Sequence, residues 1–179
     1  MRAYAMLFLI VALPLTAGAT TDTAVFAEGC FWGTEYIFSK APGVVSTRVG
    51  FTGGNVENPS YHLVCTGTTH HLEGIEVTFD PSKTTYEALA RLFFESHDQT
   101  QTDGQGPDIG EQYHSAIFFR NDEQKKTAEK LIAELKAKGI KIATQVRPAS
   151  TFWPAEDYHQ HYYEKNGGKP YCHSYHKLF

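Results

Sequence analysis

The sequence predicts an α+β protein in which helices and a mixed sheet form a two-layer α/β sandwich. Apolar and polar residues alternate in several short segments, whereas apolar residues recur every three or four positions in others. The first six segments run strand, helix, strand, strand, helix, strand, which is the ferredoxin-like βαββαβ order. The chain has 179 residues, 41% hydrophobic and 20% charged. This composition suits one buried core and excludes a disordered chain or a multi-pass membrane protein.

Each predicted element rests on its local pattern. The expected strands cover residues 24–27, 44–51, 74–80, 115–119 and 140–146, and the expected helices cover residues 31–40, 84–95 and 122–138. Pro42-Gly43 ends the first helix. In the second strand Val45, Val49 and Phe51 are expected on one side, and the third strand alternates cleanly. Thr84 and Asn121 begin the later helices as caps.

Two connections are longer than ordinary loops. They cover residues 55–73 and 96–112, and the chain ends in an irregular tail from about residue 164 to 179. Glycines in the tail indicate flexibility. Long loops on a small rigid scaffold often carry function, so both loops are candidate parts of a site.

The first nineteen residues have the layout of a secretory signal peptide. Arg2 precedes an apolar run over residues 5–15, and Ala17-Gly18-Ala19 suits cleavage near Ala19. The run is too short for a comfortable membrane span, although a retained anchor is the alternative. We therefore expect an exported, periplasmic or secreted, domain at residues 20–179. Without Arg2 it holds 15 Lys and Arg against 20 Asp and Glu, a net charge of −5, which argues against nucleic-acid binding.

Three cysteines in an exported chain leave at least one thiol outside any disulfide. No Cys-x-x-Cys pair occurs, so redox chemistry would join cysteines that are distant in sequence. Cys30 lies where a strand leads into a helix, and the helix N-terminus there lowers the pKa of a thiol. Phe31 and Trp32 would give it an apolar wall. The alternative for an isolated cysteine is a buried structural role.

Several motifs together resemble the peptide methionine sulfoxide reductase A family. They are Gly29-Cys30-Phe31-Trp32-Gly33, the segments 58–67 and 71–81 around Tyr61 and Glu73, His97-Asp98, the segment 105–115 around Asp108 and Tyr113, and Trp153 to Gln160. The likeness runs from about Ala24 to the C-terminus. It implies a peptide methionine (S)-S-oxide reductase, an oxidoreductase that repairs oxidised proteins and also acts on free methionine sulfoxide.

The resemblance assigns roles residue by residue. Cys30 matches the thiol that attacks the sulfoxide sulfur, and Asp108 matches an aspartate that helps position the site. Glu73, Tyr61 and Tyr113 match residues around the sulfoxide oxygen, and Phe31 and Trp32 match the pocket for the substrate methyl group. His70, Gln99 and His114 depart from residues that are usual in the family; a glycine is common at position 70.

The chemistry of a sulfoxide explains these residue types. Its oxygen is a poor leaving group until it is protonated, and a buried carboxyl such as Glu73 has a raised pKa and can supply that proton. The phenols of Tyr61 and Tyr113 can donate hydrogen bonds as charge builds on the oxygen. Taken singly, Glu73 could be a solvent-facing strand residue, and the chain has ten tyrosines.

Oxygen transfer would leave Cys30 as a sulfenic acid, which condenses with a second thiol. Cys172 is the favoured partner because it lies in the mobile tail, and Cys65 is the rival. The resemblance implies thioredoxin or another dithiol as the electron donor and no tightly bound cofactor. We expect a monomer.

Two other classes of function fit parts of the sequence. A secreted thiol hydrolase would pair Cys30 with a base, and His97 with Asp98 is the nearest candidate. A metal-binding protein would use some of the nine histidines, but their spacings form no recognised four-ligand set, so no metal site is predicted.

Overall fold

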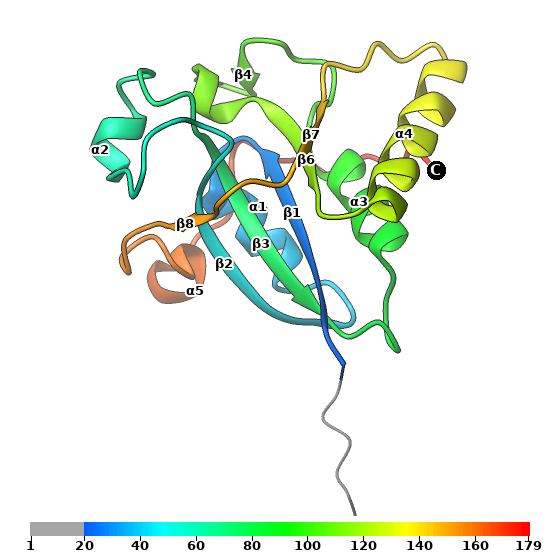
Figure 1. Cartoon of the computed structure of the whole chain (residues 1–179), viewed down its shortest axis with the longest axis horizontal. Helices are drawn as coiled ribbons and strands as arrows, with labels where there is room; N and C mark the ends of the chain where they lie inside the picture. The colour runs from blue at the N-terminus through cyan, green and yellow to red at the C-terminus, as the bar shows by residue number, and fades with distance from the viewer. Residues whose placement is uncertain (1–19) are drawn as a thin grey trace, which may run out of the picture.

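A six-stranded mixed sheet forms the centre of the computed structural model, which describes residues 20–179 (Figure 1). Its strands are β1 (Asp22–Glu28), β2 (Val44–Thr52), β3 (Leu72–Phe79), β6 (Ser115–Phe119), β7 (Gln145–Pro148) and β8 (Trp153–Pro154). They lie in the order β7-β6-β1-β3-β2-β8. All neighbours are antiparallel except the parallel pair β6 and β7. The inner order β6-β1-β3-β2 confirms the ferredoxin-like core.

Three long helices pack against one face of this sheet. They are α1 (Phe31–Phe38), α3 (Tyr86–Ser96) and α4 (Asp122–Ala137), with α4 beside α3 (Figure 1). The Thr85 hydroxyl accepts from the Ala88 N–H at 3.1 Å, and the Asn121 side chain accepts from the Gln124 N–H at 2.9 Å. These bonds satisfy N–H groups that have no partner within the helix. The predicted cap at Asn121 is confirmed, and the cap of α3 lies one residue after Thr84.

Alternation along β1 divides the core between the two faces of the sheet. Phe26 points toward the helices and stacks on Phe38 and Phe93 at 5.4 and 5.2 Å between ring centroids. Val25 and Ala27 point to the other face, where Phe152 packs against them. All three β1 side chains are at most 5% exposed. The strand that leads to Cys30 is therefore held on both faces.

Two details of the predicted strands are wrong. Val45 is 60% exposed because a bulge between Val44 and Ser46 shifts the register of β2 against β3. The strand expected over residues 140–146 is a loop up to residue 144, and β7 follows it. Ile140 and Ile142 pack against the core from this loop. The alternation of apolar residues therefore arises here without hydrogen bonding to a neighbouring strand.

The long loops contain short elements that the sequence did not predict. These are α2 (Tyr61–Val64), the hairpin of β4 (Gly104–Gln105) and β5 (Asp108–Ile109), and the 3-10 helix η1 (Glu111–Tyr113); α5 (Tyr162–Asn166) precedes the tail. The signal peptide expected at residues 1–19 lies outside the described residues. Within residues 20–179, none of the helices is both long and apolar enough to cross a membrane.

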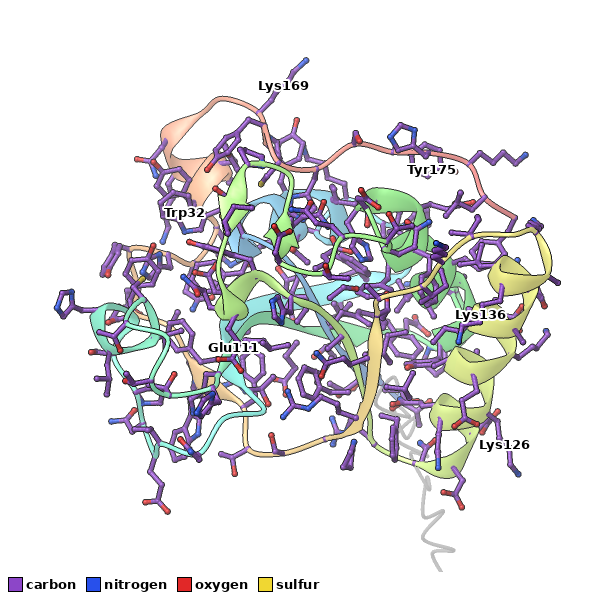
Figure 2. All side chains as sticks on the ribbon, turned by 90° about the horizontal axis from the view of Figure 1, so that it is seen from above. Trp32, Glu111, Lys126, Lys136, Lys169 and Tyr175 are labelled. Atoms are coloured by element: carbon purple, nitrogen blue, oxygen red, sulfur yellow. The ribbon has the colours of Figure 1, made fainter. Side chains whose placement is uncertain are left out.

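The C-terminal tail (residues 167–179) is irregular, as expected, and crosses the molecule from α5 toward α3 and α4 (Figure 2). Its end is bound to Glu95 on α3, whose carboxylate accepts from the N–H groups of Leu178 and Phe179 at 2.9 and 3.2 Å. The Tyr175 hydroxyl donates to the same carboxylate at 2.9 Å. In this structure the tail is docked, and its predicted flexibility stays a prediction.

Candidate active site

Cys30 is the N-cap residue of α1, at the end of the turn that follows β1. Its carbonyl accepts from the N–H groups of Gly33 and Thr34 at 3.0 and 3.3 Å. Gly29 has φ +100°, and a Cβ atom there would lie 2.5 Å from the Cβ of Gln105. Glycine is therefore required at this turn. The turn presents the Cys30 sulfur at the helix N-terminus, as the sequence predicts.

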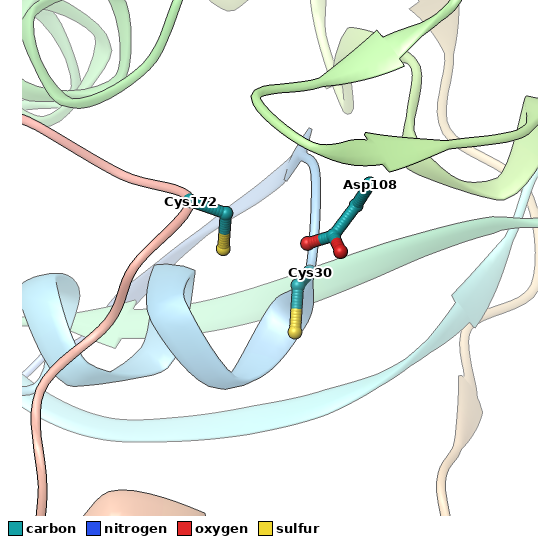
Figure 3. A group of neighbouring side chains, drawn as sticks. All are labelled: Cys30, Asp108 and Cys172. Carbon is teal, nitrogen blue, oxygen red and sulfur yellow. The ribbon is translucent and has the colours of Figure 1, made fainter.

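Cys30 faces a second sulfur, that of Cys172 on the tail, and the carboxylate of Asp108 on β5 (Figure 3). The two sulfurs and an oxygen of Asp108 all lie within 4.8 Å of one another. A hydrogen bond from the Cys172 thiol lowers the pKa of Cys30, assisted by the backbone N–H groups of Trp32 and Gly33, although burial opposes them. The same hydrogen bond raises the pKa of Cys172. The lowered pKa of Cys30 and the raised pKa of Cys172 therefore favour a Cys30 thiolate beside a Cys172 thiol.

Glu73 lies on β3 and is 1% exposed. Burial, and then the charge of Cys30, raise the pKa of this carboxyl well above its usual value. Its Oε2 accepts from the N–H of Phe31 at 3.1 Å. The pKa is thus raised as the sequence predicts, which favours the protonated carboxyl, and this carboxyl is bonded to the residue that follows Cys30.

Tyr61 and Tyr113 come from the two long loops, on α2 and η1 respectively. Burial raises the pKa of both phenols, and the charge of Glu73 is the next cause for each. The Tyr61 N–H is fixed by a bond to Glu156 Oε1 at 3.1 Å. Both tyrosines are therefore neutral hydrogen-bond donors around Glu73.

Aromatic rings surround the approach to this carboxyl. Phe31 is 1% exposed and packs on Phe51 at 5.7 Å between centroids, so it supports the pocket from the core. Trp32 stacks flat on Tyr162, with 3.6 Å between centroids, and its indole N–H donates to His159 Nδ1 at 2.9 Å. A hollow of about 340 Å³ opens beside this stack.

His159 is a pocket residue that the sequence patterns do not single out. It is 1% exposed, and its ring lies 4.4 Å from that of Tyr61 and 5.0 Å from that of Phe31. Because Nδ1 accepts from Trp32, Nε2 carries the proton of the neutral ring. The available signal was its position in the motif from Trp153 to Gln160.

Asp108 connects the hairpin to the tail. Its Oδ1 accepts from the Tyr171 hydroxyl at 3.0 Å, whereas its buried Oδ2 has no hydrogen-bond partner within residues 20–179. The carboxylate points toward Cys30 (Figure 3). Asp108 thus fits the positioning role that the sequence predicts.

The rival residues lie elsewhere or have other partners. Cys65 is exposed, follows α2 and hydrogen-bonds to Tyr61. His97, the suggested hydrolase base, is bonded to the Phe93 carbonyl and the Ser115 hydroxyl at 2.6 and 2.7 Å. Over residues 20–179, the potential metal-ligand group is Cys30, Asp108 and Cys172, which includes no histidine. The histidine-rich metal site therefore has no support.

Comparisons with known proteins agree with this geometry. The family model described as peptide methionine sulfoxide reductase matches residues 22–178. Peptide methionine sulfoxide reductase MsrA of Methanothermobacter thermautotrophicus is 51% identical over 148 residues, which cover 81% of this chain and 88% of that protein.

Solved structures also resemble this fold. Reduced Mxr1 from Saccharomyces cerevisiae has a TM-score of 0.81 and 37% identity, over 86% of this chain and 90% of that one. Mxr1 in complex with Trx2 has a TM-score of 0.61 and 24% identity, over 93% and 95% of the two chains, and supports the fold alone. Since the matches span nearly all of the described domain, the chain belongs to the peptide methionine sulfoxide reductase family of oxidoreductases.

Proposed function

We propose that this chain reduces the S epimer of methionine sulfoxide, free and in oxidised proteins, through a sulfenic acid on Cys30 and a disulfide with Cys172. The observation that carries the proposal is that Cys30, at the N-terminus of α1, and the buried Glu73 carboxyl meet in an aromatic pocket, where Glu73 Oε2 accepts from the N–H of Phe31 at 3.1 Å. The lowered pKa of Cys30 favours its thiolate and the raised pKa of Glu73 favours its protonated form, which are the states that sulfoxide reduction requires.

In the first half-reaction the Cys30 thiolate attacks the sulfoxide sulfur. Glu73 gives its proton to the oxygen, and Tyr61 and Tyr113 donate hydrogen bonds while negative charge develops there. The oxygen moves to Cys30 with two electrons passing to the substrate sulfur. The products are methionine and the Cys30 sulfenic acid. The aromatic rings beside Cys30, with Trp32 as the partly exposed wall, suit the substrate methyl group.

In the second half-reaction Cys172 attacks the oxidised Cys30, forming a disulfide and releasing water. The position of Cys172 within 4.8 Å of Cys30 supports it over Cys65 as the resolving thiol. A thioredoxin-like dithiol then reduces the disulfide. The structure of reduced Mxr1 is 37% identical to this chain, and Mxr1 also forms a complex with Trx2, which supports a partner of this kind.

We further propose that the protein works outside the cytoplasm, as a monomer. The support for export is the signal-peptide layout of residues 1–19. The methionines repaired, and the dithiol that supplies electrons, would then be found in the same compartment. Expression with a C-terminal reporter and fractionation of the cells tests the location.

Epimer-resolved turnover of residues 20–179 tests the function. We expect the S epimer, and not the R epimer, to yield methionine with dithiothreitol as reductant, and Cys30→Ser to yield none. An acyl-enzyme burst with an activated ester, with no need for reductant, would point to a hydrolase instead. Full activity in Cys30→Ser would contradict the mechanism.

Thioredoxin-supported turnover tests the resolving thiol. Cys172→Ser should form one methionine per chain, accumulate sulfenic acid and stop, whereas Cys65→Ser is the matched control and should turn over normally. The opposite pattern would assign the resolving role to Cys65.

A further inference from the structure

The imidazole of His173 fills a slot beside the active-site turn. A Cβ atom added at Gly33 would overlap its Nδ1 and Cε1 atoms, and one at Gly29 would come within 3.7 Å of Cε1. The side chain is fully buried. A ring seated this closely keeps one orientation, so each of its nitrogens has a defined partner.

The two ring nitrogens face different groups. Nε2 lies 2.8 Å from the carbonyl oxygen of Glu28, which can only accept, so Nε2 carries the proton. Nδ1 lies 3.1 Å from Cys172 Sγ. Burial lowers the pKa of His173, so the ring is neutral and Nδ1 offers its lone pair to the thiol.

A buried carboxyl group lies behind the ring. Glu28 is fully buried, and its Oε2 accepts from the Ser96 hydroxyl at 2.9 Å. Its Oε1 has no hydrogen-bond partner in the described part of the chain and lies 3.7 Å from His173 Nε2. Leaving a buried acceptor without a partner is unfavourable. This oxygen faces Nε2, which shares the positive charge of the ring when Nδ1 gains a proton.

From this geometry we propose that His173 is the base that takes the thiol proton of Cys172 during disulfide formation, and that Glu28 stabilises the resulting imidazolium. The inference rests on the proposed function. Cys172 Sγ loses its proton to Nδ1 and bonds to Cys30 Sγ, while the S–O bond of the sulfenic acid breaks. The departing hydroxide takes the proton from His173 and leaves as water. Cys172 is oxidised and the sulfenic sulfur is reduced, so no other reagent is needed.

Other acceptors near the thiol fit this step less well. The Cys172 thiol has one proton, and in the reduced protein the Cys30 thiolate competes with His173 for it; that thiolate no longer exists once Cys30 carries oxygen. An oxygen of Asp108 lies within 4.8 Å of Cys172 Sγ, but the hydrogen bond that Asp108 makes is accepted from the Tyr171 hydroxyl, whereas His173 Nδ1 lies 3.1 Å from that sulfur. His173 remains, next to a hollow of about 420 Å³ through which water can leave.

Several elements present charged or titratable groups to the ring. They are Glu28 on β1, Cys30 at the start of α1, His97 after α3, Asp108 on β5 and Cys172 on the tail itself. Because Glu28, His97 and Asp108 influence the ionisation of His173, the test compares rates over a range of pH rather than at one value.

The test measures the two half-reactions, methionine formation and disulfide formation, separately in His173→Asn. Residues 20–179 are mixed with one equivalent of the S epimer of methionine sulfoxide, and methionine, dimedone-reactive sulfenic acid and disulfide are quantified after acid quenching, from about pH 6 to about pH 9.5. His176→Asn is the matched control, since His176 is an exposed tail histidine bonded to Ser174. Glu28→Gln probes the same step with the imidazole retained.

We expect His173→Asn to form methionine at the wild-type rate and disulfide about 10²-fold more slowly at neutral pH, with recovery as rising pH ionises Cys172 directly. Glu28→Gln should slow disulfide formation less, and His176→Asn should not slow it. If disulfide formation in His173→Asn is unchanged, or is slowed equally at every pH, His173 is not the base. If His173→Asn does not fold, an unchanged rate in Glu28→Gln overturns the proposal. Failure of the wild type to form methionine would instead refute the proposed function.

Discussion

The active-site turn (residues 29–33) and the C-terminal tail each supply one of the two facing sulfurs, but different kinds of structure support them. The turn joins β1 to α1, and β1 is bonded to β3 on one side and β6 on the other. The tail has no regular structure and is held by side-chain contacts, chiefly to Glu95, Asp108 and the slot for His173. Reduction of the substrate therefore depends on the sheet, whereas disulfide formation depends on a few contacts that can break without unfolding the domain.

The largest expected effect lies on the sheet side of this comparison. Glu73→Gln removes the proton donor, so we expect methionine formation to fall by about 10²- to 10⁴-fold while the tail stays docked. In the wild type the rate should fall as the pH rises through the raised pKa of Glu73. Single-turnover rates of the wild type and of Glu73→Gln, measured over a range of pH, test both expectations. Glu76→Gln, farther along the same strand, is the control.

The same substitution has a predictable effect on stability. The folded pKa of Glu73 is raised by burial, so the unfolded chain loses this proton at lower pH than the folded chain. The neutral carboxyl makes its whole contribution to the free energy of unfolding below the pKa of Glu73 in the unfolded chain, about 4.3. This contribution decreases as the pH rises from there toward the pKa of Glu73 in the folded protein. Glu73→Gln should therefore be at least as stable as the wild type at neutral pH. A large loss of stability would show that Glu73 is ionised in the folded protein.

The second expected effect lies on the tail side. Gly33→Ala puts a methyl group into the slot occupied by His173, so the tail must shift while Cys30 and Glu73 stay in place. We expect methionine formation to persist and disulfide formation to slow about tenfold or more, by the same reasoning as for loss of the base. Rapid-quench assays of both products measure the difference.

A double-mutant cycle gives the control for this variant. If overlap with the ring is the cause, Gly33→Ala should have little further effect in a His173→Ala background, because the ring is already gone. Equal effects in both backgrounds would show that the methyl group acts on the Cys30 turn itself.

The same contrast explains which parts of the site the sequence could predict. Cys30 and Glu73 are marked by local signals, a strand–helix junction and an alternating strand, and the regular elements follow from periodicity. His173 and Glu28 gain their roles from each other although they are 145 residues apart, and neither residue carries a local signal. The bulge at Val45 was missed because alternation assumes an unbroken ladder.

A smaller effect is expected where the end of the tail meets α3. Burial alone would raise the pKa of Glu95, but the hydrogen bonds from Leu178, Phe179 and Tyr175 outweigh it and lower the pKa. These bonds contribute fully to docking above pH 4.3, roughly the pKa of a glutamate in the unfolded chain. Their contribution is lost as the pH falls through the lower pKa that Glu95 has in the folded protein. We expect Glu95→Gln to weaken docking by about 1 kcal/mol, close to fivefold.

Hydrogen exchange of residues 171–179, measured together with disulfide formation, tests this contact. Glu87→Gln is the matched control, because Glu87 lies on the same helix and pairs with Arg91 and Lys130. If Glu95→Gln leaves exchange in the tail unchanged at neutral pH, the other contacts, chiefly the bond to Asp108 and the slot for His173, are sufficient to hold the tail.

The smallest effect is expected at His70, beside the strand that carries Glu73. His70 has φ +55°, a left-handed conformation that disfavours most side chains by about 1 kcal/mol and that glycine adopts without this cost. The side chain pairs with Glu111 on η1 at 3.0 Å, with both partners largely exposed. Such a pair contributes little, and glycine adds unfolded-state entropy of about 0.5–1 kcal/mol. His70→Gly should therefore change the free energy of unfolding by less than about 0.5 kcal/mol.

Thermal unfolding of His70→Gly beside Glu111→Gln separates the backbone contribution from the ion pair. A much larger loss in both variants would mean that the pair holds η1, and with it Tyr113, against the sheet.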